Sequence, residues 1–161
     1  MKNRCFIVAL GIFLLFSASC TSTAPTEPLQ KKYEQIIEFS ELDSKTIFDR
    51  ANVWAVRAFN SADAVIEYSN EESGTIAGKF VYDVFATYFF YNIDKARVIL
   101  TINIKDNRCR LTYQMADIHI TGASSLWRAP SDAEFKQMKF EETCESLTQD
   151  FKKAIETTDD W

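Results

Sequence analysis

Histidine, glycine and proline are scarce in this sequence, and each shortage excludes a class of function. Its 161 residues include one histidine, His119, so a metal site with several imidazole ligands cannot form. Four glycines and three prolines are too few and too scattered for a glycine-rich phosphate loop or a long low-complexity linker. Cys-x-x-Cys and Gly-x-Ser-x-Gly motifs are also missing. We therefore expect no catalytic residues, no cofactor and no metal ion.

Basic residues are outnumbered by acidic ones, which argues against nucleic acid as a partner. The chain has 18 Lys and Arg against 23 Asp and Glu, a net charge of −5. Nonspecific affinity for nucleic acid comes from cations that displace counterions from phosphates. The charge therefore has the wrong sign for a nucleic-acid-binding protein.

The longest apolar run is too short to cross a membrane but fits a secretory signal. It extends from Phe6 to Phe16, whereas a spanning helix needs about 20 apolar residues. Lys2 and Arg4 precede it, and small residues leading to Cys20 follow, in the order of a bacterial signal peptide. We expect residues 1–19 to be a signal peptide.

Cys20 follows the small residues directly, which resembles the signal of a lipoprotein whose cysteine is lipidated. The position three residues earlier holds Ser17 instead of the usual Leu, so an ordinary cleaved signal and an uncleaved anchor stay open. Thr21 after the cysteine, in place of Asp, favours the outer membrane, with the leaflet undetermined. We expect an exported protein that is anchored to the bacterial envelope through lipid on Cys20. Residues 20–32, broken by Pro25 and Pro28, would be the lipidated cysteine and a flexible tether.

Residues 33–157 are expected to form one α+β domain. A first strand alternates through residues 33–39, and a helix with Trp54 on its apolar stripe follows the N-cap candidate Asp43. Alternating segments between residues 64 and 120 predict a meander of strands, in which the apolar parity switches near Ala116. The capping box Ser131–Glu134 opens a last amphipathic helix. We predict an antiparallel sheet of about five strands with two helices on one face, in the order β-α-β-β-β-β-α.

The second face of this sheet is expected to be open and polar. Alternation along the strands places seven residues there as a possible contact surface: Glu67, Lys79, Thr101, Asn103, Arg110, Thr112 and Gln114.

Three segments resemble a known family. They are Trp54 in a helix after an extended start, the run Gly74–Lys79, and the run Ile104–Tyr113. Together they look like domain of unknown function 4468, a family of secreted and lipoprotein-type bacterial proteins with a TATA-binding-protein-like (TBP-like) fold. The resemblance covers roughly residues 33–120 and implies that fold. It carries no catalytic role, and the fold does not imply DNA binding.

Little in the sequence suggests chemistry. His119 and Asp117, two residues apart on a strand, could share a face as a functional pair, although a surface or capping histidine is the plainer interpretation. Neighbouring acids such as Glu71 and Glu72 look like solvated charge instead of a glycosidase pair. An uncharacterised hydrolase is the third hypothesis for this chain.

Cys109 and Cys144 are a possible disulfide. Both lie on apolar stripes that face the layer between sheet and helix, and an exported protein meets an oxidising environment. The alternative is two separate buried thiols that act as small hydrophobic side chains.

The aromatic segment of residues 85–91 is the candidate contact surface, centred on Tyr88, Phe89, Phe90 and Tyr91. Consecutive aromatic residues cannot all face one side of a strand, so some must lie outside the local core, against the last helix, a partner or solvent. The alternative to a contact surface is an aromatic edge strand that is covered within its own domain. We expect a non-enzymatic envelope lipoprotein, a small binding or accessory module for an unknown protein or glycan. The alternative is a structural or assembly subunit that self-associates or docks through this segment.

Overall fold

The computed structural model describes residues 31–58, 65–88, 90–122 and 124–157. The elements run in the following order: β1 (Lys32–Glu38), α2 (Ser44–Ala58), β2 (Val65–Asn70), β3 (Thr75–Tyr88), β4 (Tyr91–Lys105), β5 (Arg108–Gly122), β6 (Leu126–Arg128), α3 (Asp132–Gln137) and α4 (Phe140–Glu156). Cys20, the predicted signal peptide of residues 1–19 and most of the tether lie outside the described residues.

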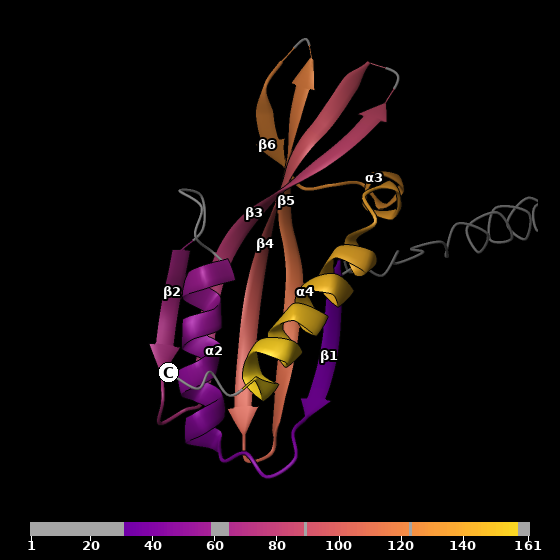
Figure 1. Cartoon of the computed structure of the whole chain (residues 1–161). Coiled ribbons are helices and arrows are strands. Elements are labelled where there is room, and N and C mark those ends of the chain that lie inside the picture. The colour runs from indigo at the N-terminus through magenta and orange to yellow at the C-terminus, as the bar shows by residue number, and fades with distance from the viewer. Residues whose placement is uncertain (1–30, 59–64, 89, 123, 158–161) are drawn as a thin grey trace, which may run out of the picture.

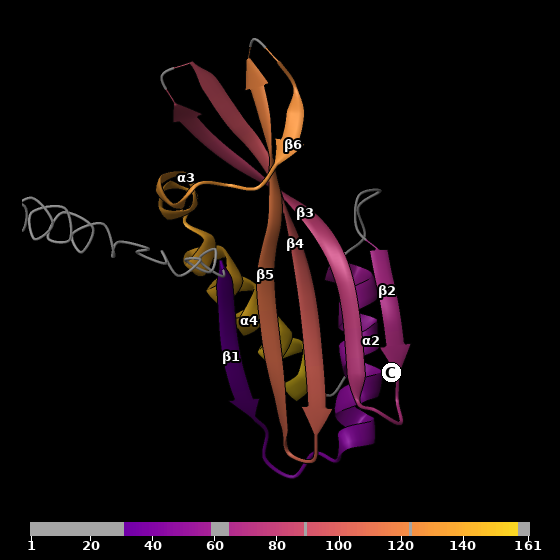
Figure 2. The same ribbon diagram turned by 180° about the vertical axis from the view of Figure 1, so that it is seen from behind.

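One antiparallel sheet contains the six strands of the described residues, in the order β1-β5-β4-β3-β2 with β6 on the edge of β5. The predicted α+β class and the order of the first elements are confirmed. The sheet has one strand more than the five predicted, and the additional strand is β6. The sequence did not predict it because it is only three residues long and has no clear alternation. Figure 1 shows α2 and α4 packed on one face of the sheet, and Figure 2 shows the opposite face from behind.

The strands differ in length, and this difference shapes the molecule. β3, β4 and β5 have 14 or 15 residues each, whereas the outer strands β1 and β2 have seven and six. The long strands therefore continue beyond the helices, where β6 takes the edge of β5 that β1 leaves free. We call this extension the distal arm, formed by the described residues of 83–95 and 117–128 (Figure 1).

The predicted parity switch near Ala116 is confirmed as a bulge. Val98 pairs with Met115 and Arg97 pairs with Asp117, so Ala116 has no partner on β4. An extra residue on one strand returns the following apolar residues to the core side. Ile118 is accordingly buried, as Met115 is.

The core lies between the sheet and the two long helices. Trp54 of α2 is buried and meets Phe151 of α4 edge-on, with 5.0 Å between the ring centroids. The Trp54 indole N–H donates to the Asp150 carboxylate at 2.9 Å, which satisfies the one polar atom of this ring. The predicted position of Trp54 on the apolar stripe of its helix is therefore confirmed, and the residue anchors the core.

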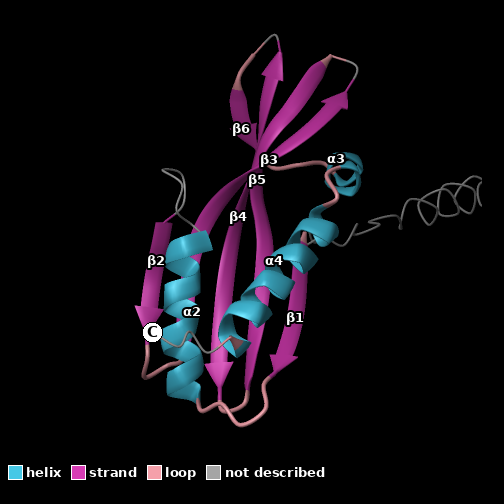
Figure 3. Ribbon diagram, viewed as in Figure 1, coloured by secondary structure: helices cyan, strands magenta, loops and turns pink. Residues whose placement is uncertain are grey.

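The last helix is broken, where one continuous helix was predicted. The capping box of Ser131 and Glu134 is present, but α3 ends after Gln137 and Lys139 takes a left-handed conformation with φ 51° before α4 begins. The two helices run in different directions. In Figure 3, α3 is seen nearly end-on beside the distal arm, while α4 runs across the sheet. A single straight helix could not contact both. No helix in the described part of the chain is long and apolar enough to span a membrane.

Candidate functional site

The open sheet face carries the seven predicted polar residues, none of which is buried. The register places Thr101 opposite Thr112 and Asn103 opposite Arg110, so these four side chains form two rows across β4 and β5. Many charges on this face are matched locally. Lys79, for example, lies 2.6 Å from Glu67.

The β1 side of this face carries a further small charge cluster. Glu34 of β1 lies 2.7 Å from Lys32 and 3.7 Å from Arg110. Hydrogen bonding with Lys32 lowers the pKa of the Glu34 carboxyl below its usual range. Gln114, the last of the seven residues, pairs with Lys32 across the β1–β5 ladder. The face is therefore a mixed-charge surface, not a field of one sign.

The predicted contact residues of the aromatic segment have different environments. Tyr88 and Tyr91 stack on each other with centroids 5.2 Å apart and rings 6° from parallel, and both pack against the core. Phe90 lies in the turn between β3 and β4 and is 91% exposed. Phe89 is outside the described residues. Only part of this segment is thus available for contact.

Phe85 is the most unusual residue of the distal arm. It sits in an irregularity of the β3–β4 ladder between Asp83 and Ala86, with φ 53°. Its side chain is 83% exposed. A bulky residue in the left-handed region is a genuine outlier, and such outliers cluster at functional sites.

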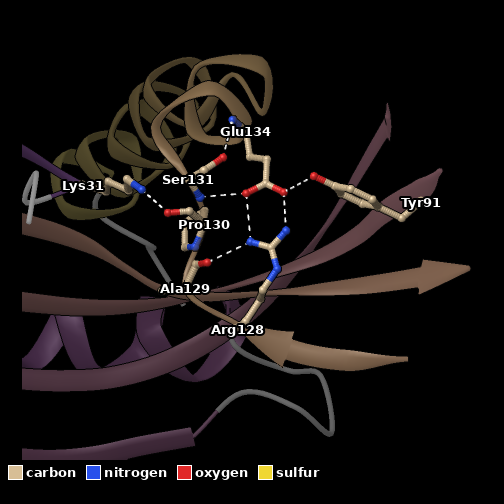
Figure 4. Close-up of polar contacts among 7 residues, drawn as sticks. All are labelled: Lys31, Tyr91, Arg128, Ala129, Pro130, Ser131 and Glu134. Carbon is tan, nitrogen blue, oxygen red and sulfur yellow. Dashed lines mark hydrogen bonds and ion pairs between the residues drawn. The ribbon is translucent and has the colours of Figure 1, made fainter. Parts of the chain in front are cut away.

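A buried carboxylate fastens the distal arm to α3 (Figure 4). The Glu134 side chain is 2% exposed and accepts hydrogen bonds from Arg128 on β6 at 2.5 and 2.9 Å. The Tyr91 hydroxyl donates to it at 2.5 Å and the Ser131 backbone N–H at 2.7 Å. The pKa of the Glu134 carboxyl is held far below its usual range, mainly by the hydrogen bonds from Arg128. Burial alone would raise this pKa, whereas the hydrogen bonds with Tyr91 and Ser131 lower it further. Every part of this carboxylate is engaged, so it serves the fold instead of a ligand.

The chain enters the domain beside this cluster. The Lys31 ammonium donates to the carbonyl oxygen of Pro130 and lies 3.3 Å from Asp132 at the start of α3. Lys31 belongs to the end of the predicted tether of residues 20–32. α3 therefore contacts both the distal arm and the start of the domain (Figure 4).

His119 pairs with Asp94, not with Asp117 as the spacing suggested. Its Nδ1 lies 2.7 Å from Asp94 Oδ1, and its Nε2 lies 2.9 Å from the hydroxyl oxygen of Ser125. Asp117 instead accepts from Arg97 at 2.9 Å, because the bulge at Ala116 brings those two residues opposite each other. The order Ser–His–Asp is that of a hydrolase triad. Here it joins β4, β5 and the turn before β6, with Trp127 packed 5.1 Å from the imidazole.

Cys109 and Cys144 are both buried and both free. The structure therefore has two separate buried thiols in place of the possible disulfide. Burial raises the pKa of each thiol to about 12. Within the described residues, no group of three or more histidine, cysteine, aspartate or glutamate side chains could hold a metal ion.

We expect both thiols to resist iodoacetamide in the native protein at pH 8, since the reactive thiolate is scarce and covered. Unfolding in denaturant without reductant should make both Cys109 and Cys144 alkylatable, as measured by mass spectrometry of the peptides that contain them. Recovery of a peptide pair that contains Cys109 and Cys144 joined by a disulfide would contradict this expectation.

The fold and its open face define the chain as a TBP-like α+β protein. A family model, domain of unknown function (DUF4468) with TBP-like fold, matches residues 33–121, and the chain belongs to this family. A DUF4468 family protein from Bacteroides ovatus is similar in structure, with a TM-score of 0.59 and 16% identity over 81% of this chain and 88% of that one.

A TBP-like protein from Parabacteroides distasonis is similar to the same degree. It has a TM-score of 0.60 and 16% identity over 80% of this chain and 94% of that one. At this identity the likeness concerns the fold alone. No curated protein matches the chain.

The sequence did not indicate two features of the distal arm. Arg128 and Tyr91 reach Glu134 from 6 and 43 residues away, and no local pattern connects them. The link from Asp94 through His119 to Ser125 depends on strand register and on the turn before β6. The scarcity of histidine drew attention to His119, but only the register identifies its partners.

Proposed function

We propose that the chain is a non-enzymatic lipoprotein of the bacterial cell envelope and acts there as a small binding or accessory module. The basic start, the apolar run and Cys20 support export and attachment through lipid. Thr21 supports the outer membrane as the destination. The binding role rests on one observation, the display of Phe85 on the distal arm.

Phe85 carries two energetic costs that the fold does not require. A left-handed conformation costs a non-glycine residue roughly 1–2 kcal/mol. Leaving a Phe side chain in water forgoes about 1.5–3 kcal/mol of burial. A glycine at this position would avoid the first cost and a polar residue the second. A contact that covers the exposed ring offsets both costs, so Phe85 supports a role in binding.

Phe90 extends this surface to the end of the arm. The β3–β4 turn presents it at 91% exposure, and the ladder beneath it is anchored by the stacked pair Tyr88 and Tyr91. Large apolar side chains displayed on a rigid support are typical of interaction sites. The proposed partner is a protein or glycan of the envelope that covers Phe85 and Phe90.

We expect the double variant Phe85→Gly/Phe90→Ser to keep the fold and lose its partner. Relief of the positive φ should leave the free energy of unfolding unchanged or raise it by up to about 1 kcal/mol. Chemical cross-linking in envelope fractions, with capture of the full chain and mass spectrometry, measures the loss of specific partners.

The matched control is Val53→Ser/Val56→Ser, which removes two exposed apolar side chains from α2. It should retain every partner that the natural chain captures. Equal partner sets for the natural chain and for Phe85→Gly/Phe90→Ser would contradict a binding role of the distal arm.

The assembly alternative uses the same residues and is separated by oligomeric state. Light scattering after size-exclusion chromatography should show a monomer for a binding module. A concentration-dependent oligomer that Phe85→Gly/Phe90→Ser abolishes would instead show self-association. Covalent labelling of Ser125 by a fluorophosphonate would contradict the non-enzymatic part of the proposal, because it requires an activated serine.

A further inference from the structure

A cavity lies at the end of the sheet opposite the distal arm. Its volume is about 340 Å³, within the range of small-molecule sites. The last residues of β4, the first residues of β5, the middle of β1 and the turn before β3 enclose it. The side chains that matter for its chemistry are Ile36, Asn103, Lys105, Arg108 and Arg110.

Three of these side chains are cations, in a protein whose net charge is negative. Lys105 and Arg108 lie directly opposite each other next to the β4–β5 turn. Like charges in this cross-strand position destabilise a hairpin. Arg110 follows on the same face of β5, opposite Asn103. An anion bound between Lys105 and Arg108 would relieve this repulsion.

Among the described residues, an ion pair within 4.0 Å reaches one of these three cations, Arg110. Glu34 is 3.7 Å from Arg110 but closer to Lys32, at 2.7 Å. Glu38 is opposite Arg108 in the β1–β5 register, yet no ion pair within 4.0 Å joins them among the described residues. No acidic residue is among those that line the cavity in this part of the chain.

The remaining wall is apolar. Ile36 of β1 is 54% exposed and is the cross-strand partner of Arg110, and both residues line the cavity. Arginine binds phosphate or carboxylate in a bidentate manner. Asn103, opposite Arg110, supplies an amide whose Nδ2 donates one hydrogen bond to Thr75 at 3.3 Å and has a second N–H. The cavity thus offers donors for two or three anionic oxygens on one side and a branched aliphatic surface on the other.

We propose that this cavity binds a small molecule in which an oxyanion, phosphate or carboxylate, is attached to a short apolar chain. Arg108, Arg110 and Lys105 bind the oxyanion, and Ile36 contacts the apolar part. This site is separate from the distal arm. The chain then has two binding surfaces at opposite ends of the sheet.

Isothermal titration calorimetry of the full chain with butyl phosphate, hexanoate, inorganic phosphate and butanol tests the proposal. We expect saturable binding of butyl phosphate, hexanoate or both, and which of them binds more tightly identifies the oxyanion. Inorganic phosphate should bind at least threefold more weakly than butyl phosphate, and butanol should not bind. Absence of binding by both anionic amphiphiles, or equal binding of inorganic and butyl phosphate, would overturn the proposal.

Two variants locate the site. Lys105→Gln/Arg108→Gln should weaken binding at least tenfold, while Lys136→Gln/Lys153→Gln, which removes the same charge from α3 and α4, should change it less than twofold. Ile36→Ser should reduce the affinity for butyl phosphate to that for inorganic phosphate. An equal loss in both charge variants would show nonspecific electrostatic attraction and overturn the proposed site. Retained melting temperatures confirm that each variant is folded.

Discussion

Replacing Arg128 by Ala should lower the free energy of unfolding by about 3 kcal/mol, the lower end of the cost of breaking a buried ion pair. The lower end applies because Arg128 is itself 35% exposed, whereas the Glu134 side chain is 2% exposed. The variant leaves a buried carboxylate with the Tyr91 hydroxyl and the Ser131 N–H as its remaining donors. Urea unfolding at pH 7, followed by circular dichroism, measures the loss.

The same cluster predicts how stability depends on pH. The folded-state pKa of Glu134 is depressed far below the ordinary value of 4.5, so the carboxylate stabilises the fold at every pH above that ordinary value. This contribution decreases as the pH falls from about 4.5 through the depressed pKa, because the unfolded chain then binds a proton that the folded chain excludes. Without Arg128, burial opposes ionisation and the folded-state pKa rises. We therefore expect the difference between the natural chain and Arg128→Ala to shrink at pH 3.

Two controls separate the ion pair from general effects of the substitution. Arg110→Ala removes an exposed arginine with one 3.7 Å ion pair and should change the free energy of unfolding by less than about 0.5 kcal/mol. Arg128→Met/Glu134→Met removes both charges and should recover much of the loss, since an apolar replacement avoids the unpaired buried charge. An Arg128→Ala variant as stable as Arg110→Ala would show that the cluster does not stabilise the distal arm.

The Glu134 cluster also shows where prediction from sequence ends. The spacing of Ser131 and Glu134 predicted a capping box, and the box is present. The same spacing could not reveal that the carboxylate is buried. That property depends on Arg128 and on Tyr91, which the β4–β5–β6 pairing brings to α3. Short-range patterns fix the start of a helix, whereas its surroundings depend on long-range register.

The strands illustrate the same limit. Alternation is a local property with period two, and it predicted the open face and the parity switch near Ala116. It also showed that residues 88–91 cannot all face one side. It could not show that Tyr88 and Tyr91 would stack against the core while Phe90 is exposed, because that depends on the pairing of Tyr88 with Tyr91 across the β3–β4 ladder, which leaves Phe90 in the turn.

Replacing Phe151 by Ala is the second substitution for which we expect a large effect. Phe151 is fully buried between α4 and α2, and its ring meets Trp54 edge-on at 5.0 Å. Truncation of a buried Phe costs about 3–5 kcal/mol, from lost transfer energy and from the cavity that remains. The Trp54 indole would then face that cavity. Thermal and urea unfolding, monitored by tryptophan fluorescence, should show the loss.

Phe85→Ala is the matched control, since it deletes the same atoms from a side chain that is 83% exposed. It should change the free energy of unfolding by less than about 0.5 kcal/mol, because the folded chain buries almost none of the Phe85 side chain and its removal therefore loses little burial. Similar losses for the two Phe→Ala variants would contradict the exposure of Phe85 and remove the basis for a contact there. A large loss of unfolding free energy for Phe151→Ala alone would show that Phe151 stabilises the domain. It would also show that the fold does not need the Phe85 ring, which a partner can then cover.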